Sequence, residues 1–167
     1  STPGRRYDPN PEGDTMGEEQ WAWFENEIRN SDAAIHIIGS SIQLIANEHG
    51  YEKWGNFPKA RQRMFDLISK HQVPRPIFIS GDRHVAEISR IDVPGLPHAL
   101  YDFTSSGLTH TWSGTWTEEP NSNRVGQMVV KKNFGMIVID WSGKEPVIRL
   151  EIRGKDNTLW SEPVVIP

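Results

Sequence analysis

Residues 76–84 read PIFISGDRH, in which a short apolar run passes directly into a glycine, an aspartate, an arginine and a histidine. The run PIFIS has the composition of a strand buried within a sheet, and the next four residues stand where that strand ends. Open α/β sheets bind their ligands just beyond the carboxyl ends of their strands. Residues 81–84 are therefore the first candidate for a functional site.

Upstream of this stretch, two amphipathic helices alternate with another apolar run. Residues 17–30 repeat apolar side chains at helical spacing, and acidic residues fill the first turn, where the helix dipole favours them. The run AAIHIIGSS at residues 33–41 predicts a strand buried on both faces. A second helix is predicted to begin at Pro58, a favoured first helical residue, and to end before Pro74.

Two segments in this half of the chain lack a regular period. Residues 1–16 are rich in glycine and proline and predict an irregular N-terminal arm, which leaves residues 17–167 as the folded domain. Residues 45–57 predict a long polar and aromatic loop between the first strand and the second helix. Loops of this length in compact domains often carry function.

Downstream of residue 84, helical patterns disappear and short strands separated by turns take over. The strands are predicted within residues 86–93, 99–106, 127–133, 134–141, 146–152 and 158–167. Helix–strand pairs followed by a run of strands predict the α/β (α+β) class. We expect a mixed sheet with helices on one side and an antiparallel run of C-terminal strands packed on the other.

The composition limits the classes of function. The chain has 167 residues, 36% of them hydrophobic and 24% charged, with seven tryptophans, as in a folded globular protein. A net charge of −4 offers no basic surface for nucleic acid. The absence of cysteine excludes disulfides and thiolate zinc sites, and no apolar run reaches the length of a membrane span. Because the chain begins with serine, we expect it to be a processed, cleaved or engineered product.

The side chains of residues 81–84 suit a metal-dependent reaction on a charged substrate. Asp82 and His84 offer an oxygen and a nitrogen ligand, and Gly81 permits a tight bend before them. Arg83 offers a fork of donors for a phosphate or carboxylate. The same tetrapeptide also suits an ordinary strand-end turn, with Asp82 paired to Arg83 and His84 partly buried, so the spacing alone leaves both interpretations open.

Four longer segments resemble, in order, the second half of PhoD-like alkaline phosphatases, which belong to the metallophosphoesterase superfamily. They span residues 16–112: MGEEQWAWFENEIRNSDAAIHIIGSSIQ at 16–43, HGYEKWGNFPKARQRMFDLI at 49–68, IFISGDRHVAEISR at 77–90 and LYDFTSSGLTHTW at 100–112. Several motifs in the same order are far more specific than any one of them. The resemblance implies the C-terminal half of a four-layer αββα sandwich with metal ions at a sheet edge.

The resemblance also implies ligands, metals and a location. Asp82 and His84 match the positions of the family's late metal-binding motif, a GHxH-type motif that reads GDRH here. Calcium and iron are the ions that the family implies, although nothing in these residues selects them over zinc, manganese or magnesium. An extracytoplasmic location is likewise implied by the family alone. The early GDxxD-like and GNHD-like segments that supply the other ligands do not occur in this sequence, and residues 40–43 read SSIQ at the strand end where the superfamily places a further metal histidine.

Further polar and aromatic residues are weaker candidates. Trp54 and Asn56 in the long loop are candidates for the substrate rim, but Trp54 is as well explained as a plug that packs the loop onto its own helix. Gln43 and Ser41 are candidates for binding a phosphate oxygen or for satisfying backbone groups at a strand end. His36 is expected in the core; the residues expected to be structural or solvated are His71, His98, His110 and the stretch 104–112.

These observations predict a phosphomonoesterase or phosphodiesterase whose metal ligands include Asp82 and His84, with His84 and Arg83 in catalysis. Arg83, Trp54, Asn56 and Gln43 are the predicted substrate-binding residues. We expect the chain to need a complementary N-terminal segment, to be inactive alone, and to self-associate when that segment is missing. The alternative is a non-catalytic interaction or carbohydrate-binding module, which only the seven tryptophans and the strand-rich C-terminal half support.

Overall fold

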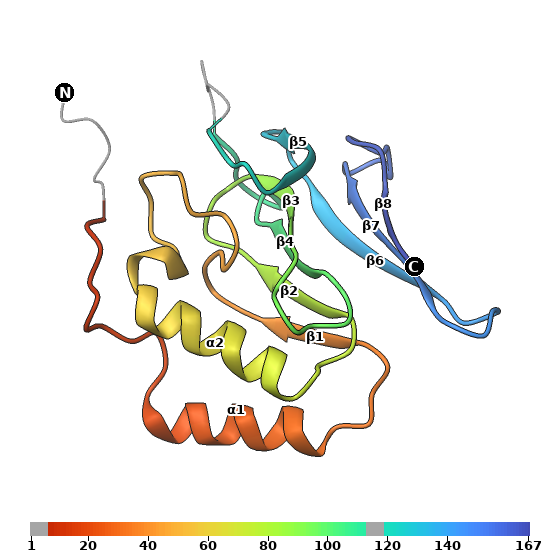
Figure 1. Cartoon of the computed structure of the whole chain (residues 1–167). Helices are drawn as coiled ribbons and strands as arrows, with labels where there is room; N and C mark the ends of the chain where they lie inside the picture. The colour runs from red at the N-terminus through yellow and green to blue at the C-terminus, as the bar shows by residue number, and fades with distance from the viewer. Residues whose placement is uncertain (1–6, 113–118) are drawn as a thin grey trace.

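Two helices, a five-stranded sheet and a smaller second sheet make up the computed structural model, which describes residues 7–112 and 119–167. Figure 1 shows the helices on one side of the larger sheet and the smaller sheet on its other side. No helix in the described part of the chain is long and apolar enough to cross a membrane. Residues 1–6 of the predicted arm lie outside the described residues, and residues 7–16 contain no helix or strand.

The two helices form where the apolar spacing predicts them. Helix α1 (Glu18–Asn30) carries its two acidic residues in the first turn and buries Trp21, Phe24 and Ile28 along one face. Helix α2 (Pro58–Lys70) begins with the proline that fixes a helical backbone angle at this position. Both helices present their apolar faces to the same side of the larger sheet, so residues 18–70 provide most of the cover on that side.

The larger sheet is mixed, as the element order predicts. Its strands lie in the order β1-β2-β4-β3-β5, and β1, β2 and β4 are parallel, whereas β3 is antiparallel to both of its neighbours. The bounds are β1 (His36–Gly39), β2 (Pro76–Ser80), β3 (Ala86–Ile91), β4 (Leu100–Ser105) and β5 (Arg124–Val129). The carboxyl ends of β2 and β4 therefore meet at one edge of the sheet, where residues 81–84 begin.

A second, antiparallel sheet contains the last three strands. They are β6 (Phe134–Asp140), β7 (Val147–Arg153) and β8 (Val164–Ile166), paired in sequence order. The prediction of a strand over 127–133 is wrong in its position. Strand β5 begins at Arg124, and residues 131 and 132 lie in the link between the two sheets.

Two separate cores fill the spaces on the two sides of the larger sheet. On the helix side, Trp21, Leu44, Met64 and Phe78 are buried together. On the other side, the second sheet covers strands β3 and β4 with a cluster of mainly branched aliphatic side chains: Ile77, Ala86, Ile88, Tyr101, Phe103, Val129, Ile148, Leu150, Ile152 and Ile166. The two sheets approach so closely at Gly135 that a Cβ atom there would lie 2.8 Å from the Phe103 ring.

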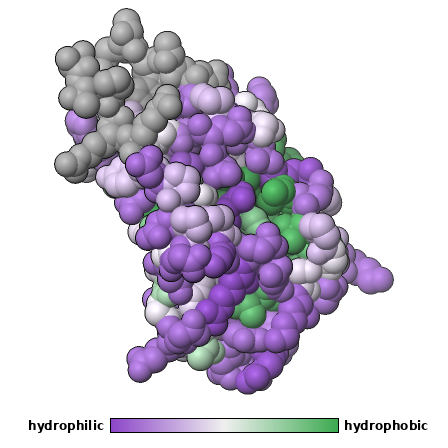
Figure 2. Space-filling view, turned by 60° about the vertical axis from the view of Figure 1, so that its left-hand side comes forward, coloured by the Kyte–Doolittle hydropathy of each residue, from purple (hydrophilic) through white to green (hydrophobic). Residues whose placement is uncertain are grey.

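Strand β1 forms the edge of the larger sheet, and no strand within residues 7–112 and 119–167 pairs with its outer side. Ile37 of β1 is 48% exposed, and Ile79 at the end of β2 is 42% exposed, because the second sheet does not extend over them. The prediction that residues 33–41 are buried on both faces is therefore wrong for the chain as it stands. On the face drawn in Figure 2, hydrophobic residues gather in the middle and hydrophilic residues surround them.

Candidate functional site

Residues 81–84, which we call the GDRH turn, leave the carboxyl end of β2 in an unusual backbone conformation. Asp82 has a φ of 64° and His84 a φ of 54°, both in the left-handed region, and the Arg83 amide donates a 2.8 Å hydrogen bond to the Gly81 carbonyl. Asp82 and His84 are exposed, whereas Arg83 between them is buried. The turn thus exposes a carboxylate and an imidazole and directs the guanidinium into the protein.

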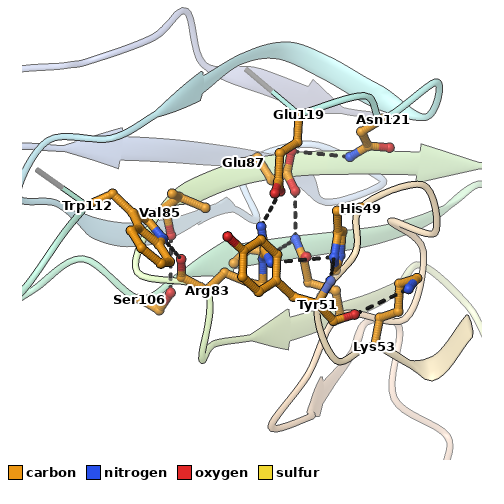
Figure 3. Close-up of polar contacts among 12 residues, drawn as sticks. His49, Tyr51, Lys53, Arg83, Val85, Glu87, Ser106, Trp112, Glu119 and Asn121 are labelled. Carbon is orange, nitrogen blue, oxygen red and sulfur yellow. Dashed lines mark hydrogen bonds and ion pairs between the residues drawn. The ribbon is translucent and has the colours of Figure 1, made fainter. Parts of the chain in front are cut away.

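The guanidinium of Arg83 is enclosed by side chains from two distant segments (Figure 3). It lies 4.3 Å above the centre of the Tyr51 ring, and its Nη2 donates to the carboxylate of Glu119. The Trp112 indole also donates a 2.9 Å hydrogen bond to the Arg83 carbonyl. Arg83 is 4% exposed, so these contacts fasten the GDRH turn to the long loop (residues 45–57) and to the segment after β4.

A neutral imidazole and a second cation stand beside this guanidinium. The His49 Nδ1 accepts a 3.2 Å hydrogen bond from the Tyr51 amide and lies 3.4 Å from Nη1 of Arg83. Burial, assisted by the charges of Arg83 and Lys53, lowers the pKa of His49 to about 3. Burial also lowers the pKa of Lys53 and raises that of Glu119. The long loop therefore packs the buried side chains of His49 and Lys53 close to the GDRH turn.

A buried polar network lies beneath the carboxyl ends of β2 and β4. Asp102 accepts hydrogen bonds from the backbone amides of Leu44 and Ile45, at 2.7 and 3.0 Å, and from the Ser80 hydroxyl at 2.7 Å. Burial raises the pKa of this carboxyl, and the hydrogen bonds oppose that effect. The network holds the chain that follows β1 down onto the sheet, and so fixes the start of the long loop.

Gln43, predicted to bind substrate, belongs to this network. It is fully buried, and its amide donates 2.7 Å hydrogen bonds to Glu87 and to Thr104. Glu87 in turn forms an ion pair of 2.7 Å with Arg124. These contacts link the loop after β1 to strands β3, β4 and β5.

Trp54 and Asn56, the other predicted rim residues, are also buried. Trp54 packs edge-to-face on Trp21 in the helix-side core and donates a 3.0 Å hydrogen bond to the Ser40 hydroxyl. Asn56 ends a short 3₁₀ helix (Trp54–Asn56), accepts a hydrogen bond from the Lys53 amide and donates one to the Tyr7 carbonyl. Their contacts describe structural roles, and substrate binding by Trp54, Asn56 and Gln43 stays a prediction.

The structure places one residue at the turn that the sequence did not single out. The rings of His84 and His110 lie 4.9 Å apart, centre to centre, and are nearly perpendicular at 87°. His110, expected to be solvated or structural, follows β4, and the parallel pairing of β4 with β2 brings it to the same sheet edge. Two histidines placed after two strands were the available signal, but only the strand order shows that they meet.

The side chains at this edge of the sheet are of the kinds that bind metal ions, but too few of them are brought together. A carboxylate and imidazoles bind hard and borderline cations, as the exposed side chains of Asp82, His84 and His110 allow. Within residues 7–112 and 119–167, however, no group of three or more acidic, histidine or cysteine side chains is arranged to hold an ion. The described residues therefore do not form a complete metal site by themselves.

A groove of about 460 Å³ lies elsewhere, between α1 and the open edge of β1. Its lining is mainly apolar and includes Trp23, Phe24, Ile28 and Ile37, and no residue of the GDRH turn contributes to it. The groove therefore follows the uncovered edge of the sheet and not the polar edge that carries the turn.

Comparison with known proteins gives one family and one fold. The sequence matches the PhoD-like phosphatase family over residues 4–146. Among solved structures, the fold is similar to the structure of PhoD, with a TM-score of 0.59 and 16% identity over 93% of this chain and 38% of that one. It is also similar to purple acid phosphatase PPD1 isolated from yellow lupin (Lupinus luteus) seeds, with a TM-score of 0.56 and 14% identity over 90% and 28% of the two chains.

At these identities the two structures show a shared fold. This chain spans well under half the length of either of them. No curated protein matches the sequence.

Proposed function

The chain belongs to the PhoD-like phosphatase family, and on this basis we propose that it supplies the C-terminal half of a metal-dependent enzyme that hydrolyses phosphate esters. The GDRH turn carries the proposal. It stands at the carboxyl end of β2, where α/β sheets bind ligands, and exposes Asp82 and His84 while Arg83 is anchored inside.

Asp82 and His84 are the residues that would hold a metal ion in this half. A metal ion bound there would polarise a phosphoryl oxygen and lower the pKa of a bound water. The chain's own contribution is to hold the two donors in place, because the contacts of Arg83 with Glu119 and Tyr51 fix the backbone between them. Calcium and iron are the ions that we propose from the family resemblance, and an extracytoplasmic location is proposed on the same basis.

The remaining ligands are proposed to come from a complementary N-terminal segment. A catalytic ion needs about three protein ligands and an open position, more than the described residues bring together. The uncovered Ile37 and Ile79 and the unpaired edge of β1 support a partner of this kind. The chain alone is expected to be inactive and to self-associate through this surface.

Arg83 is better explained as a positioning residue than as a direct phosphate ligand. Its guanidinium is committed to Glu119 and stacked on Tyr51, and its side chain is almost fully buried. Removing it would leave a partly buried carboxylate without its partner, so an Arg83→Ala variant is expected to destabilise the chain as well as the turn. If Arg83 bound phosphate from the surface instead, its removal would weaken phosphate binding without changing the free energy of unfolding.

The alternative of a carbohydrate-binding or interaction module loses part of its support. Two of the seven tryptophans, Trp21 and Trp54, are buried in the helix-side core and are not available to stack on a sugar. The family match favours a hydrolase. A phosphatase assay and a glycan-binding assay on the same preparation separate the two.

The direct test measures hydrolysis of p-nitrophenyl phosphate and bis-p-nitrophenyl phosphate in a screen of divalent and ferric ions. The chain alone is expected to be inactive, and addition of the complementary N-terminal segment is expected to produce metal-dependent activity. Asp82→Asn should abolish that activity, whereas Asp92→Asn, an exposed aspartate after β3, should not. Activity of the chain alone, or full activity of the Asp82→Asn variant, would contradict the proposal.

A further inference from the structure

His110 lies beside the GDRH turn because its segment is fastened there on both sides. The Ser106 amide donates a 3.1 Å hydrogen bond to the Val85 carbonyl, and the Trp112 indole donates one of 2.9 Å to the Arg83 carbonyl. Strands β2 and β4 pair in parallel with Ser80 opposite Thr104, so both segments leave the sheet at the same edge. His110, between the two fastened points, is therefore held next to His84 and exposed.

The spacing of the two rings suits two ligands of one ion. With zinc–nitrogen bonds of about 2.0–2.1 Å, an ion lies about 3.2 Å from each ring centre, and ligand angles of about 90–109° separate the centres by roughly 4.5–5.2 Å. The centres of His84 and His110 lie 4.9 Å apart. Both rings are exposed, so an ion can reach them without a change in the fold.

We propose that His110 is a second imidazole ligand, which binds the same metal ion as His84. The inference rests on the proposed function, because it adds a ligand to the same site. It also specifies the class of ion. Imidazole nitrogens suit zinc, iron, cobalt and nickel, whereas calcium takes oxygen ligands, so the position next to His84 and His110 is a transition-metal position.

The competing explanation is that the two rings only pack edge-to-face, which stabilises the turn without any ion. His110→Phe separates the two explanations, since phenylalanine keeps a ring of similar shape and has no nitrogen ligand. His84→Asn is the partner variant, because asparagine tolerates a positive φ such as the 54° found here. His98→Phe is the matched control, since His98 precedes β4 and lies at the opposite end of that strand.

The experiment titrates the 167-residue chain with Zn²⁺ to about 1 mM, using calorimetry and the histidine ring signals in ¹H–¹⁵N NMR spectra. The ring signals of His84 and His110 are expected to shift together, while those of His98 stay unchanged and Ca²⁺ shifts neither ring. His84→Asn and His110→Phe are each expected to weaken zinc binding at least about tenfold, and His98→Phe is expected to leave it unchanged. Far-UV circular dichroism checks that each variant folds.

The outcomes separate this inference from the proposed function. Zinc binding by His110→Phe that equals that of the wild-type chain would show a ring contact only and overturn the inference, while Asp82 and His84 keep their proposed role. A wild-type chain that binds no zinc up to about 1 mM would overturn it as well. The proposed function fails independently, if the chain completed by its N-terminal segment hydrolyses no phosphate ester.

Discussion

Phe78 and Ile79 are neighbours in β2 and face opposite sides of the sheet, yet Phe78 is 1% exposed and Ile79 is 42% exposed. The side that contains Phe78 is closed by α1, α2 and the loop after β1, all of which lie within residues 18–70. The other side is covered by a sheet that begins at Phe134 and stops short of β1. Residues close in sequence to β1 and β2 thus cover most of one side. The other side is covered in part, by strands from residue 134 onward.

The contrast separates a side that the chain covers by itself from a side that it leaves partly open. The helix side holds a continuous buried core, and the network around Asp102 closes that side at the carboxyl ends of the strands. The open side carries apolar surface next to β1, whose outer edge pairs with no other strand in the described part of the chain. Apolar surface of this kind commonly marks an interaction site.

The largest expected effect comes from truncating the two neighbours in turn. Phe78→Ala should lower the free energy of unfolding by about 3–5 kcal/mol, because it leaves a cavity in a packed core. Ile79→Ala should lower it by less than about 1 kcal/mol, because its side chain is already 42% exposed. Urea unfolding of both variants at low protein concentration measures the difference, and equal losses would show that the second side is also closed.

Asp102 tests how much the buried polar network stabilises the helix side at the carboxyl ends of the strands. Asp102→Ala leaves the amides of Leu44 and Ile45 and the Ser80 hydroxyl without their acceptor, and should cost about 2–4 kcal/mol. Asp92→Ala, at an exposed position, serves as the control and should change stability by less than about 0.5 kcal/mol. Urea unfolding measures both, and a similar small loss in the two variants would show that the network does not close this side.

The long loop predicts a dependence of stability on pH. His49 is neutral in the folded chain, with a pKa near 3, against 6.5 when exposed. The unfolded chain therefore binds more protons than the folded chain between these values, so the stabilisation is complete above pH 6.5 and is lost as the pH falls. Between pH 6.5 and about pH 5, this titration should lower the free energy of unfolding of the wild-type chain by on the order of 1–2 kcal/mol. The His49→Gln variant should not show this loss.

The measurement for His49 compares thermal or urea unfolding of the two proteins across this range. Other groups titrate there too, and they cancel in the difference between wild type and variant. An identical pH dependence in both proteins would mean that the imidazole is not buried against Arg83 and Lys53.

The smallest effect on stability is expected at the open edge. Ile37→Thr retains a β-branched side chain at an exposed strand position, so it should change the free energy of unfolding by less than about 0.5 kcal/mol. Self-association, by contrast, should fall, because apolar surface is removed from the unpaired edge. Light scattering against protein concentration measures this, and unchanged association would place the contact on another surface.

The arrangement of the fold could be predicted from the sequence, because periodicity and chain order carry it. The apolar spacing in α1 and the proline at the start of α2 locate both helices, and the strand runs locate the mixed sheet. The exposure of β1 could not be predicted in the same way, because a continuous apolar run reads as buried whether or not its cover is present. The start of β5 was misplaced, because an edge strand paired only with β3 needs no strict apolar alternation.

Part of the candidate site could likewise be predicted from the sequence, and part of it could not. The GDRH turn stands out because its position follows from the strand before it. The burial of Arg83 depends on Tyr51 and Glu119, which are far away in the sequence, and no local pattern indicates that contact. The contact of His110 with His84 could not be predicted for the same reason, since it depends on the order of the strands in the sheet.

The backbone of the GDRH turn sets stability against activity. Asp82 and His84 hold left-handed angles that glycine adopts without a steric cost, so Asp82→Gly and His84→Gly are compatible with the turn and remove both proposed donors. A laboratory evolution experiment that rewards only heat resistance would therefore have no reason to keep either side chain. Libraries built on this chain need an activity or metal-binding screen at these two positions, or the most robust clones will be those that have lost the site.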